Sequence, residues 1–118
     1  MPTLDVADDD FWLTWLGVVP QASEVSGDDF VQELRVPISE SEELHVTWDI
    51  TADSVRIRYR LGDEIVVDVL RELATLLTVE VIASEKTVVL EYSAEGAHGR
   101  TLFRVAPSFA MSDSFLKA

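Results

Sequence analysis

From residue 44 onward, apolar and polar side chains alternate with a period of two, which is the pattern of half-buried β-strands. The alternation has no fault over residues 44–50 and 55–61, and every outward position of the second run is an arginine. A short polar segment separates the two runs. They are therefore expected to form an antiparallel hairpin, with Ile50 near Val55 at its turn.

Further segments show the same alternation. Residues 78–82 and 88–92 flank a polar turn and predict a second hairpin. Another strand is expected over 100–105, and Pro107 would end it because proline has no N–H to donate to a sheet. Residues 30–38 alternate as well and predict a strand before the first hairpin, although Asp28–Asp29 also suit the cap of a short helix there.

Residues 64–76 fit two structures. Their apolar residues fall at the spacing of one helical face over four turns, and Asp63 is a suitable N-cap. However, residues 65–69 are crowded with β-branched side chains, which favour strands. A hairpin with a three-residue turn would also place Arg58 opposite Asp68, a favourable cross-strand pair. The longer helical match favours a helix over 64–76.

The N-terminal third is less regular. Asp8–Asp10 precede the apolar residues of 11–19, a pattern that predicts a capped amphipathic helix ended by Gly17. Residues 1–8 are expected to be loose, and residues 20–27 to form a loop.

The expected fold is a single α+β domain over residues 1–118. It contains the N-terminal helix, a mostly antiparallel sheet of about six strands, and a second helix inserted near 64–76. The last ten residues are expected to close the fold as a short helix or strand. An apolar content of 47% is enough to build a hydrophobic core despite the high charge.

Charge is distributed unevenly along the chain. Residues 1–53 hold thirteen carboxylates and one base, Arg35, whereas residues 54–118 hold nine carboxylates and eight bases, for a total net charge of −13. Such an asymmetry says more about binding partners than about the fold. It disfavours nucleic acids and anionic membranes, since both are polyanions that are bound through clustered Lys and Arg.

The candidate partner-binding residues follow from this asymmetry. Two acidic clusters, Asp28–Asp29 and Glu40 with Glu42 and Glu43, would form a negative patch that attracts a basic protein surface. Trp12 is a further candidate for partner binding because tryptophan is frequent at binding hot spots. Since it lies beside the core-facing side of the predicted helix, we expect its side chain to be partly exposed. The arginines at 56–60 are expected to pair with acids of neighbouring strands instead.

Signals for catalysis or cofactor binding are weak or missing in the sequence. The chain has no cysteine, which excludes disulfides and thiolate metal ligands. No stretch has the ligand spacing of a calcium loop, and neither His45 nor His98 lies in a nucleophile motif. We therefore expect no enzyme activity, no metal and no cofactor. The N-terminus lacks the pattern of a secretory signal, so a cytoplasmic protein is expected.

Two functions fit these features. A small, acidic protein without cysteine resembles, in profile only, immunity proteins that neutralise a toxin, which implies an inhibitor of a basic protein. Alternatively, the order helix, strands, helix, strands looks like that of type III secretion chaperones, which implies a dimeric chaperone or assembly subunit. That resemblance concerns architecture alone, and the strand at 100–105 departs from it. The sequence leaves a monomer and a homodimer both open.

Overall fold

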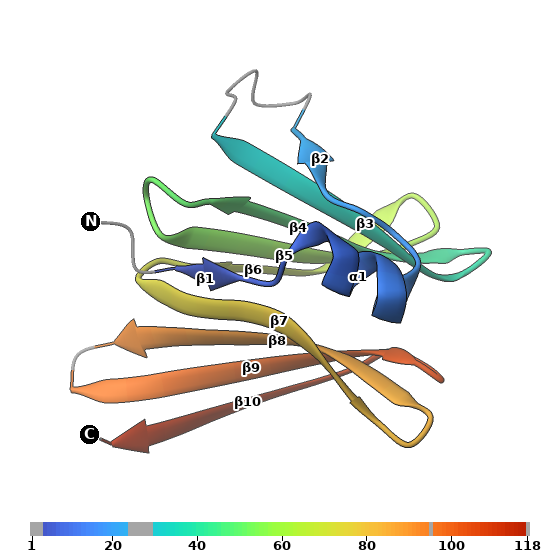
Figure 1. Ribbon diagram of the computed structural model, residues 1–118. Helices are drawn as coiled ribbons and strands as arrows, with labels where there is room; N and C mark the ends of the chain where they lie inside the picture. Colours follow the sequence, from blue (N-terminus) through green and yellow to red (C-terminus); the bar gives the residue numbers. More distant parts are fainter. Residues whose placement is uncertain (1–3, 24–29, 95, 118) are drawn as a thin grey trace.

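The computed structural model describes residues 4–23, 30–94 and 96–117. Residues 116 and 117 are described by their backbone only. Within these ranges the chain forms one short helix and ten strands (Figure 1). In chain order the elements are β1 (Asp5–Val6), α1 (Asp9–Leu16), β2 (Gln21–Ala22), β3 (Val31–Ser39), β4 (Glu42–Asp49), β5 (Ser54–Leu61), β6 (Glu64–Arg71), β7 (Ala74–Ile82), β8 (Glu85–Ala94), β9 (Ala97–Ala106) and β10 (Ala110–Lys117).

The strands form two five-stranded sheets that face each other (Figure 1). Sheet I has the order β2-β3-β4-β5-β6, and sheet II has the order β1-β7-β8-β9-β10. All neighbouring strands are antiparallel except β1, which runs parallel to β7. Sheet I is thus built from the central part of the chain and sheet II from the C-terminal part plus β1.

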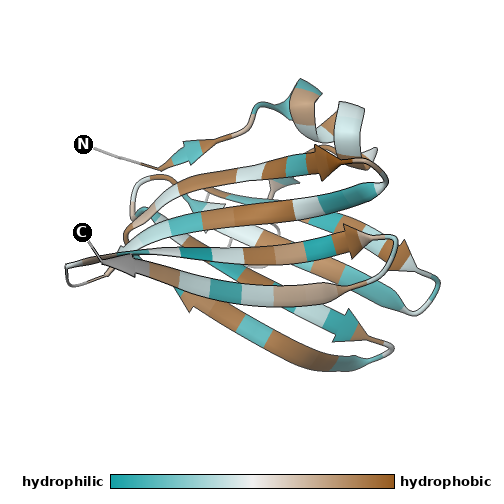
Figure 2. Cartoon of the chain, turned by 90° about the horizontal axis from the view of Figure 1, so that it is seen from below, coloured by the Kyte–Doolittle hydropathy of each residue, from teal (hydrophilic) through white to brown (hydrophobic). Residues whose placement is uncertain are grey.

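The hydrophobic core lies between the two sheets. Because side chains of a strand point alternately to its two faces, each strand gives every second residue to the core. Figure 2 shows this alternation as hydrophobic and hydrophilic bands along the strands. Helix α1 lies beside the sheets and adds one fully buried side chain, Trp12. Among the most deeply buried core residues are Leu34, Leu44, Val46, Val55 and Ile57 of sheet I and Leu77, Val88, Leu90 and Phe103 of sheet II.

The predicted helix over 64–76 is wrong, and so is the α+β fold class. These residues form β6 and the start of β7, and the fold is almost entirely β. Away from the turn the alternative register holds, since Arg58 faces Asp68, Tyr59 faces Val67 and Ile57 faces Val69. The turn itself has two residues instead of three, and the pairing shifts between Tyr59 and Arg60. The β-branched run favours the strand because it fits a pleated surface better than a helix.

Most of the strands predicted from alternation are confirmed. Strands β5, β7, β8 and β9 contain the residues expected for them, and β3 and β4 do so except for Phe30 and Ile50, which lie just outside them. One detail differs: Val55 faces Trp48 rather than Ile50. The Asp49 carboxylate accepts hydrogen bonds from the N–H groups of Thr51 and Ala52, at 2.9 and 3.3 Å, and so starts the turn one residue earlier than the alternation suggests.

The N-terminal helix is confirmed. Asp8 caps α1, with Oδ1 accepting the N–H of Phe11 at 2.9 Å, and Gly17 ends it in the left-handed conformation at φ 74°. Of the residues expected to be loose, the structure describes 4–8. Asp5–Val6 pair there with β7, and the Leu4 N–H donates to Asp53 at 3.0 Å. At the other end of the chain, β10 settles the choice between helix and strand.

Candidate functional site: a cavity at the turns of sheet I

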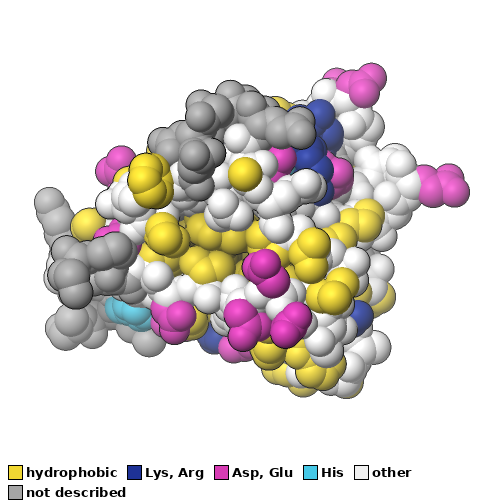
Figure 3. All heavy atoms as spheres, turned by 45° about the horizontal axis from the view of Figure 1, so that its top comes forward, with side chains coloured by type: hydrophobic (Ala, Val, Ile, Leu, Met, Phe, Trp, Pro, Cys, Tyr) yellow, Lys and Arg dark blue, Asp and Glu magenta, His cyan; other side chains and the backbone are white. Residues whose placement is uncertain are grey.

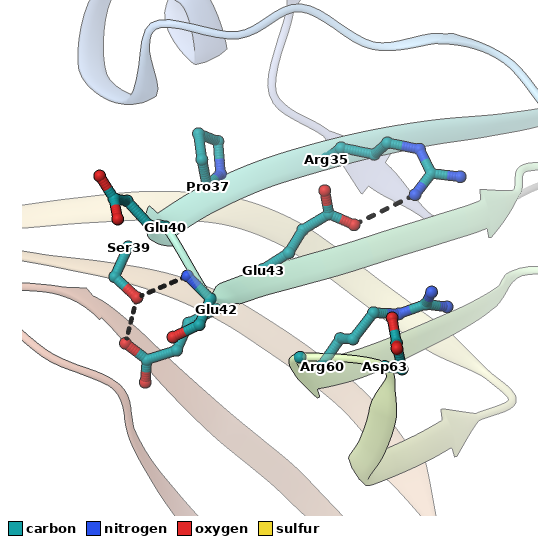
Figure 4. A pocket seen from close by; sticks show the side chains of 10 residues that line it. Arg35, Pro37, Ser39, Glu40, Glu42, Glu43, Arg60 and Asp63 are labelled. Atoms are coloured by element: carbon teal, nitrogen blue, oxygen red, sulfur yellow. Dashed lines mark hydrogen bonds and ion pairs between the residues drawn. The ribbon is translucent and has the colours of Figure 1, made fainter.

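An open cavity of about 560 Å³ lies where the β3–β4 and β5–β6 turns come together at one end of sheet I (Figure 4). Adjacent antiparallel hairpins place their turns at the same end of a sheet, so residues distant in sequence meet there. The cavity is lined by Arg35, Pro37, Ser39, Glu40, Ser41, Glu42, Glu43, Arg60, Gly62 and Asp63.

Three of the predicted partner-binding residues line this one cavity. Glu40 lies at the tip of the β3–β4 turn, and Glu42 and Glu43 follow at the start of β4. Asp63, from the β5–β6 turn, joins them and was missed in the sequence. The hairpin alternative for 64–76 would have predicted its position. A turn at 62–63 brings Asp63 to the end of sheet I where Glu40, Glu42 and Glu43 lie.

Glu42 is held in place by two hydroxyl donors. Its Oε2 accepts a hydrogen bond from Ser39 Oγ at 2.8 Å, and its Oε1 accepts a short hydrogen bond from Tyr59 Oη. These bonds, that of Tyr59 foremost, lower the pKa of Glu42 because they favour the charged carboxylate. The same contact raises the pKa of Tyr59. Its ring stacks on Phe109 with the ring centroids 3.8 Å apart. Glu42 is therefore ionised and fixed.

Glu43 belongs to a chain of paired charges along the outer face of sheet I. Arg35 donates to Glu43 at 3.1 Å and lies 3.6 Å from Glu33 (Figure 4). Glu33 Oε2 in turn lies 2.8 Å from His45 Nε2, and both of these side chains are buried. This network compensates the charge of Glu43 and holds Arg35 at the rim of the cavity.

The cavity has an excess of negative charge. Four carboxylates line it against two arginines, Arg35 and Arg60. Within the described parts of the chain no ion pair involves Glu40 or Asp63. Carboxylates therefore outnumber the bases of this cavity, although Arg60 lines it as well, and the arrangement is suited to bind a cationic group.

The other predicted residues do not join this site. Asp28 and Asp29 lie outside the described residues. Trp12, expected to be partly exposed, has an exposed fraction of 0%. It stacks against Trp48 with ring centroids 6.4 Å apart. The helix turns Trp12 toward sheet I because it is the apolar residue at the centre of the buried face, so it is a core residue and not a contact for a partner.

Two arginines of β5 pair with an acid of the neighbouring strand β6, as expected. Arg56 donates to both carboxylate oxygens of Asp68, at 2.9 and 2.7 Å, and Arg58 lies 3.7 Å from the same group. The Arg56 hydrogen bonds lower the pKa of Asp68. Asp68 is available only because 64–71 is a strand. Arg60, the third arginine of this run, lines the cavity instead.

Among the described residues, no cluster of three or more histidine, cysteine or acidic side chains has the arrangement of a metal site. No described helix has the length and apolar character needed to cross a membrane.

Comparison with models of known protein families finds no match, and comparison with curated proteins finds none either. Among solved structures, the chain is similar to a chain of the structure described as "Contact-dependent growth inhibition toxin - immunity protein complex from Klebsiella pneumoniae 342". The TM-score is 0.78 at 9% sequence identity, and the match covers 98% of this chain and 100% of that chain. The two-sheet fold described above therefore recurs over its whole length in a chain of a toxin–immunity complex.

Proposed function

We propose that this protein is an immunity-type inhibitor that binds a basic protein partner and has no catalytic activity of its own. The observation that carries the proposal is the fold match over the whole chain to a component of a toxin–immunity complex. Because folds host many functions, the likeness needs support from the surface of this chain.

Charge supplies that support. A net charge of −13 steers a basic protein toward the chain and repels polyanions. The carboxylates of Glu40 and Asp63, which form no ion pair among the described residues, supply a local negative field at the turns of sheet I. A toxin that acts on nucleic acid would instead need unpaired Lys and Arg to hold phosphates. The inhibitor is therefore the better assignment for this chain than such a toxin.

The chaperone alternative has lost its basis. It rested on a second helix inserted between strands, and those residues form β6 and β7. No other observation favours it.

The proposal is tested by growth protection. Reading frames that flank the gene are expressed one at a time in a bacterial host, with and without this chain. We expect one of them to arrest growth and this chain to restore it. The pair should copurify as a complex whose affinity falls as salt rises from 50 to 500 mM, because screening weakens charge attraction. Failure to protect against any flanking product, with the chain present in folded form, would contradict the proposal.

A pair of matched variants tests the part played by the cavity. Glu40→Gln with Asp63→Asn removes two carboxylates from it, and asparagine suits a turn as well as aspartate does. The control, Glu72→Gln with Asp10→Asn, makes the same change of charge away from the cavity, at two carboxylates that likewise form no ion pair among the described residues. We expect the first variant to slow association with the toxin several-fold more than the control, because charges near an interface act mainly on the association rate. Equal effects would exclude a special role for the cavity.

A further inference from the structure

Helix α1 presents an exposed aromatic surface. Of its eight residues only Trp12 is buried, while Phe11 and Trp15 are each 38% exposed. These two lie one turn apart, and their rings meet edge to face with centroids 6.4 Å apart. The pair forms a rigid ridge beside the buried side of the helix.

A second cavity, of about 340 Å³, lies at the Phe11 end of this ridge, with Phe11 as one wall and Thr78 of β7 as another. Val6 and Ala7 add apolar surface, and the side chains of Asp5 and Asp8 complete the lining. The Asp8 cap bond to the Phe11 N–H, at 2.9 Å, fixes the carboxylate relative to the ring. The cavity thus combines a hydrophobic lining with two carboxylates held on short, ordered segments.

The negative charge around this cavity is not compensated. Asp5, Asp8, Asp9 and Asp10 lie within six residues, and the first 34 residues contain no Lys or Arg. No ion pair among the described residues involves any of these four aspartates. By contrast, each of six arginines elsewhere lies within 3.7 Å of a carboxylate, namely Arg35, Arg56, Arg58, Arg71, Arg100 and Arg104. On the face that carries α1, acidic side chains border a group of hydrophobic ones (Figure 3).

We propose that this second cavity receives an arginine side chain of the basic protein partner. The inference rests on the proposed function, since it presumes that partner. The aliphatic stem of the arginine would pack on Val6 and Ala7, and its guanidinium would meet the Asp5 and Asp8 carboxylates and the face or edge of Phe11. Guanidinium suits such a site better than ammonium because it is planar, weakly hydrated and able to bind carboxylates through two nitrogens. Trp15 then forms an apolar contact beside it.

The test uses a defined probe. A blocked pentapeptide, acetyl-Gly-Arg-Gly-Arg-Gly-amide, is titrated into the ¹⁵N-labelled chain, with the same peptide carrying citrulline as a neutral control. We expect shifts of backbone amide signals to concentrate on residues 5–11 and Thr78, and the citrulline peptide to cause no such shifts. Shifts concentrated on the turns of sheet I, or equal binding of the citrulline peptide, would overturn the inference.

Variants on the same helix provide a matched comparison. Asp5→Asn with Asp8→Asn removes both carboxylates from the cavity, and asparagine caps a helix as well as aspartate does. The control, Asp9→Asn with Asp10→Asn, makes the same change of charge just outside the cavity. We expect the first variant to bind the arginine peptide about tenfold more weakly, as for the loss of charge-assisted hydrogen bonds, and the control to change affinity about twofold. Equal weakening would show a diffuse field and refute a specific site.

The two proposals fail in different ways. A flanking toxin that is neutralised equally well by the Asp5→Asn, Asp8→Asn variant and by the control would overturn the arginine site and leave the immunity function standing. Peptide binding that maps to the second cavity, in a chain that protects against no flanking product, would refute the immunity function while the site remains.

Discussion

Replacing Gly99 by alanine should destabilise the protein because Tyr92 occupies the space of the missing side chain. Gly99 on β9 faces Tyr92 on β8, and a Cβ at this position would lie 2.2 Å from Cζ and 2.4 Å from Cε2 of the tyrosine ring. Real atoms do not approach so closely, so the ring must move. The backbone at Gly99 lies outside the left-handed region, which makes the conflict purely steric.

The tyrosine ring is held on several sides. Its Oη donates to Asp113 at 3.3 Å, the Arg71 guanidinium lies 4.9 Å from the ring centroid, and Phe115 packs edge to face at 5.9 Å. Overpacking of this kind costs about 1–3 kcal/mol. Loss of the Asp113 hydrogen bond adds about 1 kcal/mol. Alanine regains about 0.5–1 kcal/mol relative to glycine in a strand.

The net loss expected for Gly99→Ala is about 1–3.5 kcal/mol, which lowers Tm by about 4–14 °C for a domain of this size. Urea unfolding followed by tryptophan fluorescence measures it. The control is the same substitution in a Tyr92→Leu background, where the smaller side chain leaves room and alanine should be neutral or slightly stabilising. An equal loss in both backgrounds would refute the steric reasoning.

Three further results are expected. Trp12→Ala should reduce the free energy of unfolding by about 3–5 kcal/mol because it empties a fully buried site, whereas Trp15→Ala should cost about 1 kcal/mol or less; a reversed order in urea titrations would contradict the assignment of Trp12 to the core. Tyr59→Phe keeps the ring but removes the main cause of the low Glu42 pKa, so that pKa should rise toward its ordinary 4.5 in a carboxyl NMR titration. A lowered pKa stabilises the folded state above pH 4.5, and that contribution is lost as the pH falls. The phenylalanine variant should therefore lose less stability on acidification than the parent protein. The same dependence of unfolding free energy on pH in both proteins would contradict this. Finally, the affinity for the proposed toxin partner should fall steeply with salt, in contrast to a binding surface dominated by apolar contacts, which would show little dependence.

Local patterns in the sequence were enough for most strands and for the helix. Alternation over 44–50 and 55–61 predicted β4 and β5, since the period of two follows from the geometry of a single strand. Asp8 and Gly17 marked the ends of α1 because capping depends on residues within one turn. These features need no knowledge of distant contacts.

Residues 64–76 show where local patterns fail. Their apolar spacing fits one helical face. In the structure, however, the same residues are divided between two strands, β6 and β7, that belong to different sheets. Pairing of Arg58 with Asp68 was visible as an alternative, and only the neighbouring strand could decide for it. The error followed from giving the longer helical match more weight than the β-branched run and the Arg58–Asp68 pairing.

The site shows the same division. The acidic character of the chain and the cluster at Glu40–Glu43 are sequence properties, because charge is fixed by composition. Tertiary structure decided that Asp63 joins this cluster and that Trp12 faces the core. It also brought Asp5 and Thr78 to the same cavity as Phe11, since β1 pairs with β7 across more than sixty residues of chain. Strand periodicity and net charge are thus determined by the sequence itself, whereas the faces that meet and the charges that remain unpaired depend on non-local packing.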